Sequence, residues 1–435
     1  MPKKQKMSTG LVWFRNDLRI TDHEALKEAC INHEKVIGVY FFDPRHFQKT
    51  RFGFPKTGKF RAKFLIESIQ DLNNKLESLN ISLLVYQKKP EDLIADLVSK
   101  YEIQSIYFQE EWTSEEKDVE KAVRAVVPKL EFHSYHQQFL YHPEDIPFAS
   151  FQKIPRVFTE FRKACEKQIS IRPLTSAPTP LHPSNLLDEN SIIPGLEELG
   201  LSEFETDSRT AFPFKGGEKQ ALKRVETYFW KTKNLSAYKE TRNGLIGEAY
   251  SSKLSAWLAN GSISPKQIYY EVKKYEKEIT SNQSTYWLIL ELIWRDFFKY
   301  VSLKHGNKIF HLKGILEKDL KWNYDDLQLK DWIDGNTSEV FINANMKEIA
   351  ATGFMSNRGR QNVNSFWAKE LQQDWRVGAS YFESQLIDYD VHSNWGNWMY
   401  NSGVGNDPRD RKFNIKSQAD RYDPNQEYQN LWLND

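Results

Sequence analysis

Carboxylates, amides and large aromatic rings occur together in LIDYDVHSNWGNWMYNSG, residues 386–403. If this stretch is helical, Asp388, Trp395 and Trp398 share one broad stripe, whereas Asp390 faces away. Tryptophans at helical spacing usually belong to a core, but buried aspartates need cations or hydrogen-bond donors. The stretch therefore predicts either ordinary core packing or a polar ligand site.

A second stretch, ELIWRDFF, places Glu291, Trp294 and Arg295 on one face of an expected helix. The segments TYWLIL before it and FFKYV after it are apolar, so the helix is expected to be buried. A buried carboxylate and guanidinium need partners, which a bound polar ligand supplies. A solvated salt bridge of small energetic value is the alternative.

Serines cluster in YSSKLSAWLANG, where Ser251, Ser252 and Ser255 stand at the expected start of a helix. Hydroxyls beside free backbone N–H groups favour a diphosphate at such a position, and Tyr238 upstream is able to cover it. Ordinary capping of the helix by serine is the alternative.

Arginines and amides crowd the stretch TGFMSNRGRQNVNSF, after the candidate helix cap Ser356. This pattern favours an anionic ligand or an internal carboxylate, and a solvated helix face is the alternative. The polar residues are Asn357, Arg358, Arg360, Asn362 and Asn364.

Short β-branched or aromatic runs alternate with amphipathic helical stretches from Leu11 to Tyr135. The alternation predicts an α/β fold with a Rossmann-like, doubly wound parallel sheet. No GxGxxG follows the first strand, which excludes the usual dinucleotide-binding variant. The expected strands are LVWF (11–14), KVIGVYFF (35–42), ISLLVYQ (81–87), IQSIYF (103–108) and KLEFHSY (129–135).

Proline is concentrated in the next segment, where nine of the 17 prolines lie from Pro143 to Pro213. Because proline fixes φ and removes a donor, this segment predicts an extended linker with at most short helices. After it, strand signals vanish and helical runs follow one another, which predicts an all-helical second domain. The predicted domains are residues 1–140, the linker 141–214 and the helical domain 215–435.

Composition narrows the class of protein. The 60 basic and 59 acidic residues give a net charge of +1, so no global field favours nucleic acid or a membrane. Two cysteines are too few for a disulfide framework or a four-cysteine metal site, and the sequence shows no signal peptide or membrane span. We therefore expect a cytoplasmic protein without a metal site. Aromatic residues make up 14% of the chain, and eleven of the 13 tryptophans lie from Trp230 onward.

Taken in chain order, these stretches resemble the photolyase/cryptochrome family. The resemblance is carried by Tyr238 followed by SSKLS, ELIWR, SNRGRQN, DWR, LIDYD and NWGNW. The longer stretches TGFMSNRGRQNV and DWRVGASYFESQLIDYDVHSNWGNWMYNSGVGNDPR resemble the cryptochrome-DASH branch. With VWFRNDLRITDHEAL near the start and YDPNQEYQNLWL near the end, the resemblance covers nearly the whole chain.

The resemblance implies that the helical domain binds FAD non-covalently. It implies that Arg360 pairs with Asp388 and that Asp390 accepts from the pyrimidine edge of the flavin. Asn394 would face flavin N5, where a neutral amide favours the reduced forms. The implied cofactor-binding residues are Tyr238, Ser251, Ser252, Lys253, Leu254, Ser255, Glu291, Arg295, Asn357, Arg360, Asp388, Asp390 and Asn394.

The implied activity is that of a DASH-type deoxyribodipyrimidine photo-lyase, in which excited FADH⁻ donates an electron that opens a cyclobutane pyrimidine dimer in DNA. Glu291 and Asn394 are the implied catalytic residues, and the implied lesion contacts are Trp294, Gln361 and Tyr400. Gln361 and Tyr400 replace the methionine and tryptophan of many duplex-acting relatives. This favours dimers in single-stranded DNA, where moving the lesion out of the stack is less costly.

Two further groups acquire roles from the resemblance. Trp398, Trp375 and Trp322 fall on the electron-transfer triad of the family, whereas Trp332 keeps a core interpretation. QEEWTSEEKD resembles the stretch that binds a 5,10-methenyltetrahydrofolate antenna, with Glu111 contacting the pterin. Trp112, beside it, stands where relatives more often have a small aliphatic residue, and an acidic, capped helix is the alternative interpretation.

The alternative function is a blue-light photoreceptor that binds FAD and nucleic acid with little repair turnover. Repair of six-four photoproducts is disfavoured because Asn357 and Gln361 occupy the positions where that subgroup has histidines. We expect a monomer that has no membrane partner and binds DNA containing pyrimidine dimers. The plausible phosphate contacts are Arg358, Arg409, Arg411 and Lys412.

Overall fold

The N-terminal region is built on one parallel sheet. The computed structural model describes residues 8–189 and 191–434. All strand pairs are parallel, and the strand order β3-β2-β1-β4-β5 confirms the predicted doubly wound sheet. The strands are β1 (Thr9–Phe14), β2 (Lys35–Phe41), β3 (Leu83–Tyr86), β4 (Ile103–Gln109) and β5 (Glu131–Tyr135).

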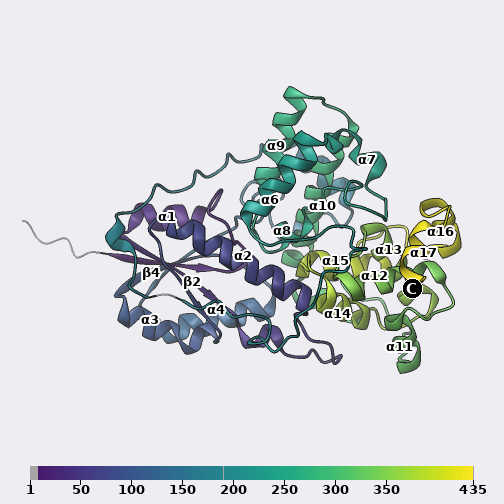
Figure 1. Ribbon diagram of the computed structural model, residues 1–435, viewed down its shortest axis with the longest axis horizontal. Helices are drawn as coiled ribbons and strands as arrows, with labels where there is room; N and C mark the ends of the chain where they lie inside the picture. Colours follow the sequence, from purple (N-terminus) through teal and green to yellow (C-terminus); the bar gives the residue numbers. More distant parts are fainter. Residues whose placement is uncertain (1–7, 190, 435) are drawn as a thin grey trace, which may run out of the picture.

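Helices cover both faces of this sheet (Figure 1), so its central strand β1 is buried along its whole length. Side chains of α1 and α2 join one core, and those of α3 and α4 join the core on the opposite face. The covering helices are α1 (Glu24–Asn32), α2 (Lys59–Glu77), α3 (Ile94–Lys100) and α4 (Ser114–Val126).

Most described residues of the proline-rich segment lie outside helices and strands, but the segment contains one α-helix of 11 residues, α5 (Phe158–Gln168). Phe158, Phe161 and Cys165 lie on one side of α5 and are buried. This helical spacing of apolar residues outweighs the local effect of the flanking prolines. The predicted boundaries at residues 140 and 214 remain predictions.

From residue 215 onward, all the regular elements of the described residues are helices, as predicted. These helices form the second body in Figure 1, which ends at the yellow C-terminal helices. After α5 the α-helices are α6 (Glu218–Val225), α7 (Tyr238–Thr241), α8 (Ser255–Ala259), α9 (Pro265–Glu278), α10 (Gln283–His305), α11 (Asp326–Asp334), α12 (Val340–Thr352), α13 (Asn357–Ser365), α14 (Trp375–Gln385), α15 (Val391–Ser402), α16 (Ile415–Tyr422) and α17 (Glu427–Leu433).

The two bodies are joined by the loop after β1. Arg19 is 1% exposed, and its guanidinium donates to the carbonyl oxygens of Asp22, Gln137 and Gly261. A Cβ on Gly261 would lie 2.1 Å from the carbonyl oxygen of Asn16. The close contact fixes how the sheet meets the helical body.

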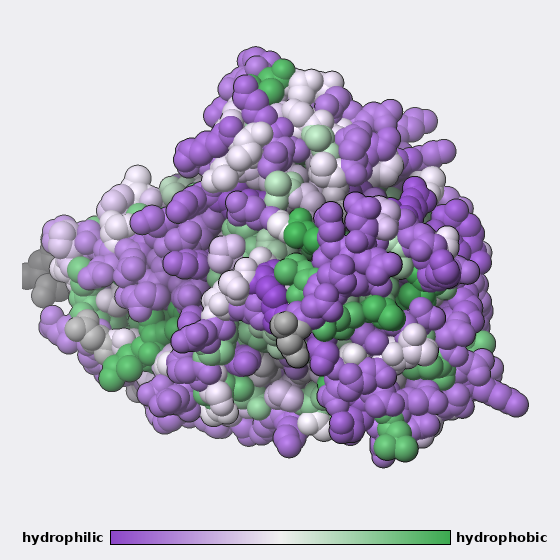
Figure 2. Space-filling view, turned by 45° about the vertical axis from the view of Figure 1, so that its right-hand side comes forward, coloured by the Kyte–Doolittle hydropathy of each residue, from purple (hydrophilic) through white to green (hydrophobic). Residues whose placement is uncertain are grey.

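Figure 2 shows a face that is mainly hydrophilic, with smaller hydrophobic areas between polar side chains. Within the described ranges, no helix combines the length and the apolar character that crossing a membrane requires.

Candidate functional site

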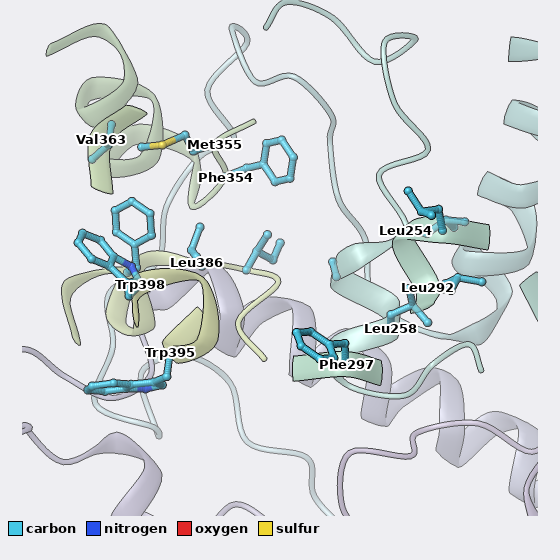
Figure 3. Close-up of a cluster of buried hydrophobic side chains, with 14 of the residues drawn as sticks. Leu254, Leu258, Leu292, Phe297, Phe354, Met355, Val363, Leu386, Trp395 and Trp398 are labelled. Atoms are coloured by element: carbon cyan, nitrogen blue, oxygen red, sulfur yellow. The ribbon is translucent and has the colours of Figure 1, made fainter. Parts of the chain in front are cut away.

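The main cavity, of about 520 Å³, lies inside the helical body. A second cavity of about 60 Å³ adjoins it and shares Arg360, Asp388 and Asp390 with it. Figure 3 shows hydrophobic walls on two sides, with Leu254, Leu258 and Leu292 in one group and Phe354 and Met355 in the other. The volume is that of a site for an organic ligand rather than for a single ion.

The residues predicted for cofactor and lesion all line one of these two cavities. Helices and loops far apart in the chain bring them together. The predicted lining residues are Tyr238, Ser251, Ser252, Lys253, Leu254, Ser255, Glu291, Trp294, Arg295, Asn357, Arg360, Gln361, Asp388, Asp390, Asn394 and Tyr400.

The serine stretch forms a loop at the cavity wall. Helix α8 begins at Ser255, the residue before it is Leu254, and no side chain caps the helix. The alternative of serine capping is therefore wrong. Arg224, which the sequence patterns missed, holds the loop by donating to the carbonyl oxygens of Ser251 and Ser252 at 2.9 and 2.8 Å.

Lys253 is the loop residue best placed to meet an anion. Its backbone is left-handed, with φ 59°, and the residue is 3% exposed. Nζ lies over the ring of Tyr250, has no hydrogen-bond partner and belongs to a residue that lines the cavity. Burial lowers the pKa of Lys253 well below its ordinary value. Because burial disfavours the charged form and Nζ has no hydrogen-bond partner, an anionic ligand would stabilise the ammonium form of Lys253.

Two aspartates mark the opposite side. Asp388 accepts from Nη2 of Arg360 at 2.9 Å with both oxygens, which is the pairing expected from the sequence. Asp390 was predicted to face away, but α15 begins only at Val391, so Asp390 precedes the helix and lines the cavity. Its carboxylate caps α15 by accepting from the backbone N–H of Ser393 at 2.8 Å.

Asp390 is held as an ion. Its Oδ2 lies 3.1 Å from Nζ of Lys299, a residue that the sequence patterns did not single out. Burial raises the pKa of Asp390, but Lys299 and other cations lower it more, and the net pKa falls below its ordinary value. A charged acceptor therefore lies at this edge of the cavity.

Asn394 has a defined amide orientation. Its Nδ2 donates to the carbonyl oxygen of Ala379 at 3.0 Å. The amide oxygen is therefore left to accept from a ligand in the smaller cavity, which Asn394 lines.

The lesion side combines an ion pair with aromatic rings. Glu291 lies 2.6 Å from Nη1 of Arg242, which also lines the cavity but was missed in the sequence. Trp294 stacks on Phe158 at 3.6 Å between ring centroids and meets Tyr400 edge-on at 6.0 Å. The rings of Trp294 and Tyr400 stand at right angles and line the cavity beside a carboxylate, a surface that suits a planar polar base.

Of the other basic residues predicted to contact a ligand or phosphate, some line the main cavity and some do not. Arg295 lines the main cavity and donates to the carbonyl oxygens of Gln138 and Leu258 at 2.6 and 3.0 Å, which uses two of its five N–H donors. Arg358 and Arg411 line the main cavity. Arg409 and Lys412 lie outside its lining, and Lys412 pairs with Glu370.

The three tryptophans of the predicted triad lie in different surroundings. The ring centroids of Trp398 and Trp332 lie 6.3 Å apart, and those of Trp375 and Trp395 lie 5.7 Å apart. Trp322 is half-buried. A bridge between Asn323 and Gln373 brings its segment beside the start of α14, where Trp375 lies. The structure thus places Trp322 and Trp375 on neighbouring segments.

Glu111 lies at the point where the strand order reverses. It follows β4, and its Oε1 accepts from Gln109 at 2.8 Å and from Asn16, which follows β1, at 3.3 Å. Carboxyl ends of strands at such a switch point are a common ligand site. Four buried atoms nearby have no hydrogen-bond partner, namely Gln109 Oε1, Glu116 Oε2, His136 Nδ1 and Gln138 Oε1.

Known proteins resemble this chain over nearly its whole length. The DNA photolyase family model matches residues 10–183, and the FAD binding domain of DNA photolyase matches residues 287–435. Cryptochrome DASH of Xenopus laevis is 48% identical over 425 residues, 97% of this chain and 81% of that protein. Cryptochrome DASH, chloroplastic/mitochondrial, of Arabidopsis thaliana is 44% identical over 99% of this chain and 76% of that protein.

Solved structures extend the comparison. A Synechocystis cryptochrome crystal structure superposes with a TM-score of 0.94 at 48% identity and covers 98% of this chain and 88% of that one. A class III photolyase from Agrobacterium tumefaciens superposes with a TM-score of 0.83 at 26% identity and covers 99% of this chain and 88% of that one.

Proposed function

Because the chain belongs to the photolyase/cryptochrome family, in its cryptochrome-DASH branch, we propose that it repairs cyclobutane pyrimidine dimers by light-driven electron transfer, preferentially in single-stranded DNA. It carries the FAD-binding domain of the family. The observation that supports repair is the continuity of one cavity from Lys253 to the wall of Trp294 and Tyr400.

The residues of the cavity fit FAD. The unpartnered Nζ of Lys253 suits the diphosphate, and the carboxylate of Asp390 suits an N–H donor of the flavin edge. The amide oxygen of Asn394 is free to accept a hydrogen bond from the reduced ring. When bound and reduced, FAD supplies the electron that illumination transfers to the dimer.

The chain itself positions the lesion. Trp294 and Tyr400 provide faces on which the bases of a dimer stack, while Gln361 lines the same cavity as a neutral polar contact. The carboxylate of Glu291, with its orientation fixed by Arg242, can accept a hydrogen bond from an imide N–H of the dimer. An unpaired strand delivers the dimer to this wall without the cost of breaking base pairs.

The test is loss of dimers in irradiated single-stranded and duplex oligonucleotides, under near-UV light and in the dark, with protein of known FAD content. Light-dependent loss, faster in the single strand, is expected. FAD-loaded protein without light-dependent loss in either substrate would overturn the proposal in favour of the photoreceptor alternative.

We also propose a 5,10-methenyltetrahydrofolate antenna at Glu111. The unpartnered atoms around Glu111 support a polar ligand there, and burial together with Glu111 raises the pKa of Glu116 to about 7. Flavin emission excited through added folate is the measurement, and Glu111→Gln should reduce it. Unchanged folate binding in that variant would remove Glu111 from the site.

A monomer in the cytoplasm is the proposed state of the protein. Cys30 and Cys165 are free, and Cys165 is buried, which agrees with a reducing compartment. Sedimentation with and without a dimer-containing oligonucleotide tests the monomer.

A further inference from the structure

The residues that line the two cavities all lie between positions 238 and 413, in the helical body. The sheet domain nevertheless reaches the back of the cavity wall, and one of the side chains that do so is Trp112. Trp112 follows β4, is 6% exposed and stacks between Phe139 at 5.3 Å and His392 at 4.6 Å. Its Nε1 donates to the hydroxyl oxygen of Ser302 at 2.6 Å.

Lys299 lies between this indole and the cavity. Its Nζ is 3.1 Å from Oδ2 of Asp390 and 5.5 Å from the centroid of the Trp112 ring. The side chains of Lys299 and Asp390 are 4% and 11% exposed, so little water reaches the pair. Ser302 donates to the carbonyl oxygen of Lys299 at 2.7 Å, which ties the backbone of Lys299 to the partner of Trp112.

Lys299 matters to the cavity because its ion pair with Asp390 is buried. Removing one partner leaves the other charge uncompensated in a medium that solvates it poorly. Without Lys299, Asp390 would either take up a proton or turn toward another donor. In both cases it stops presenting a charged, oriented acceptor to the cavity. The face of Trp112 helps to hold the ammonium group by a cation–π contact and excludes water from it.

We propose that Lys299 is a positioning residue for the flavin, held in place by Trp112, so that the sheet domain controls how Asp390 meets the cofactor. The inference rests on the proposed binding of FAD in the cavity. It assigns the antenna-side domain a second task, which does not depend on whether an antenna is bound.

The test compares Lys299→Met, Lys299→Arg, Trp112→Phe, Trp112→Ala and the double variant Lys299→Met/Trp112→Ala. Lys304→Met is the matched control, because Lys304 lies on the same helix and donates to the carbonyl oxygen of Ile154, away from the cavities. The readouts are the dissociation constant of FAD, the flavin reduction potential and the melting temperature of each protein.

Lys299→Met should weaken FAD binding by about tenfold or more and shift the flavin potential, because truncating one member of a buried charge pair is costly. Lys299→Arg should keep most of the wild-type FAD affinity and flavin potential, since arginine keeps the positive charge. Trp112→Ala should weaken binding less, Trp112→Phe least, and the double variant no more than Lys299→Met alone.

Folded Lys299→Met protein with the wild-type FAD affinity and potential would overturn the proposal. Strictly additive effects of the two substitutions would also overturn the link through Trp112. Failure of the wild-type protein to bind FAD is a different result, because it would remove the proposed function itself.

Discussion

Nη1 of Arg242 lies 2.6 Å from Oε1 of Glu291, so the carboxylate predicted to bind the lesion is paired with a cation that follows α7. Burial raises the pKa of Glu291, and Arg242 acts in the opposite direction. The two side chains are 22% and 30% exposed, which leaves the pair accessible from the cavity. Arg242 thereby sets the direction in which Glu291 presents its oxygens.

Glu291→Ala should slow repair by about tenfold or more, because a hydrogen bond to a charged group contributes about 1.5–3 kcal/mol. FAD affinity should change much less, since Glu291 lies on the lesion side. Repair by photoreduced protein and FAD titration measure the two effects. The control is Glu271→Ala, which removes a carboxylate bonded to Trp230 instead. Equal repair by Glu291→Ala and wild type would remove Glu291 from the mechanism.

Trp375→Phe should slow photoreduction of oxidised FAD severalfold and leave repair by chemically reduced protein largely intact. Trp375 is fully buried, so the substitution removes no contact to DNA, and the predicted role of its ring is to carry electrons inside the protein. Absorbance of the flavin under blue light, with a thiol present, follows the rate. Trp230→Phe serves as the control for loss of an indole that lines neither cavity. A wild-type photoreduction rate in Trp375→Phe would refute the triad assignment.

Asn394→Asp should lower the flavin reduction potential by about 60 mV, the equivalent of a tenfold change in a one-electron equilibrium. The carboxylate places a negative charge beside the ring position where reduction adds charge, and the amide of Asn394 does not. Spectroelectrochemical titration measures the shift. A potential equal to or above that of wild type would show that residue 394 does not face the reducible part of the flavin.

Glu348 should make stability depend on pH. It is 1% exposed and accepts from Oη of Tyr428 at 2.6 Å, and burial raises its pKa from 4.5 to about 7. Because the folded-state pKa is the higher one, the contribution of Glu348 to stability is complete below about pH 4.5 and is lost as pH rises to about 7.

Glu348→Gln should therefore flatten the fall in unfolding free energy across this pH window, by at most about 3 kcal/mol. Urea unfolding at several pH values provides the measurement, with wild-type FAD content in each sample. Glu348→Asp, which keeps a titrating group, is the comparison. An identical pH profile in Glu348→Gln and wild type would contradict the assignment.

Much of the fold follows from local patterns. The five strands were predicted because each is a short β-branched or aromatic run between turns, and helical periodicity indicated the second body in the same way. The helix over 158–168 was not predicted, because three apolar residues in a proline-rich segment give a weak local signal. The cavity residues were predicted because their motifs resemble those of a known family.

The sequence by itself determined the sheet and the helical body, because these depend on neighbours within a few turns of chain. It determined the residue types that can hold FAD through motifs that resemble those of a known family. Only the tertiary structure decided that Arg242 pairs with Glu291, that Lys299 pairs with Asp390 and that Trp112 stacks on His392. The last of these joins residues of different domains. Such pairs depend on how helices and strands pack in three dimensions, and no local period records that packing.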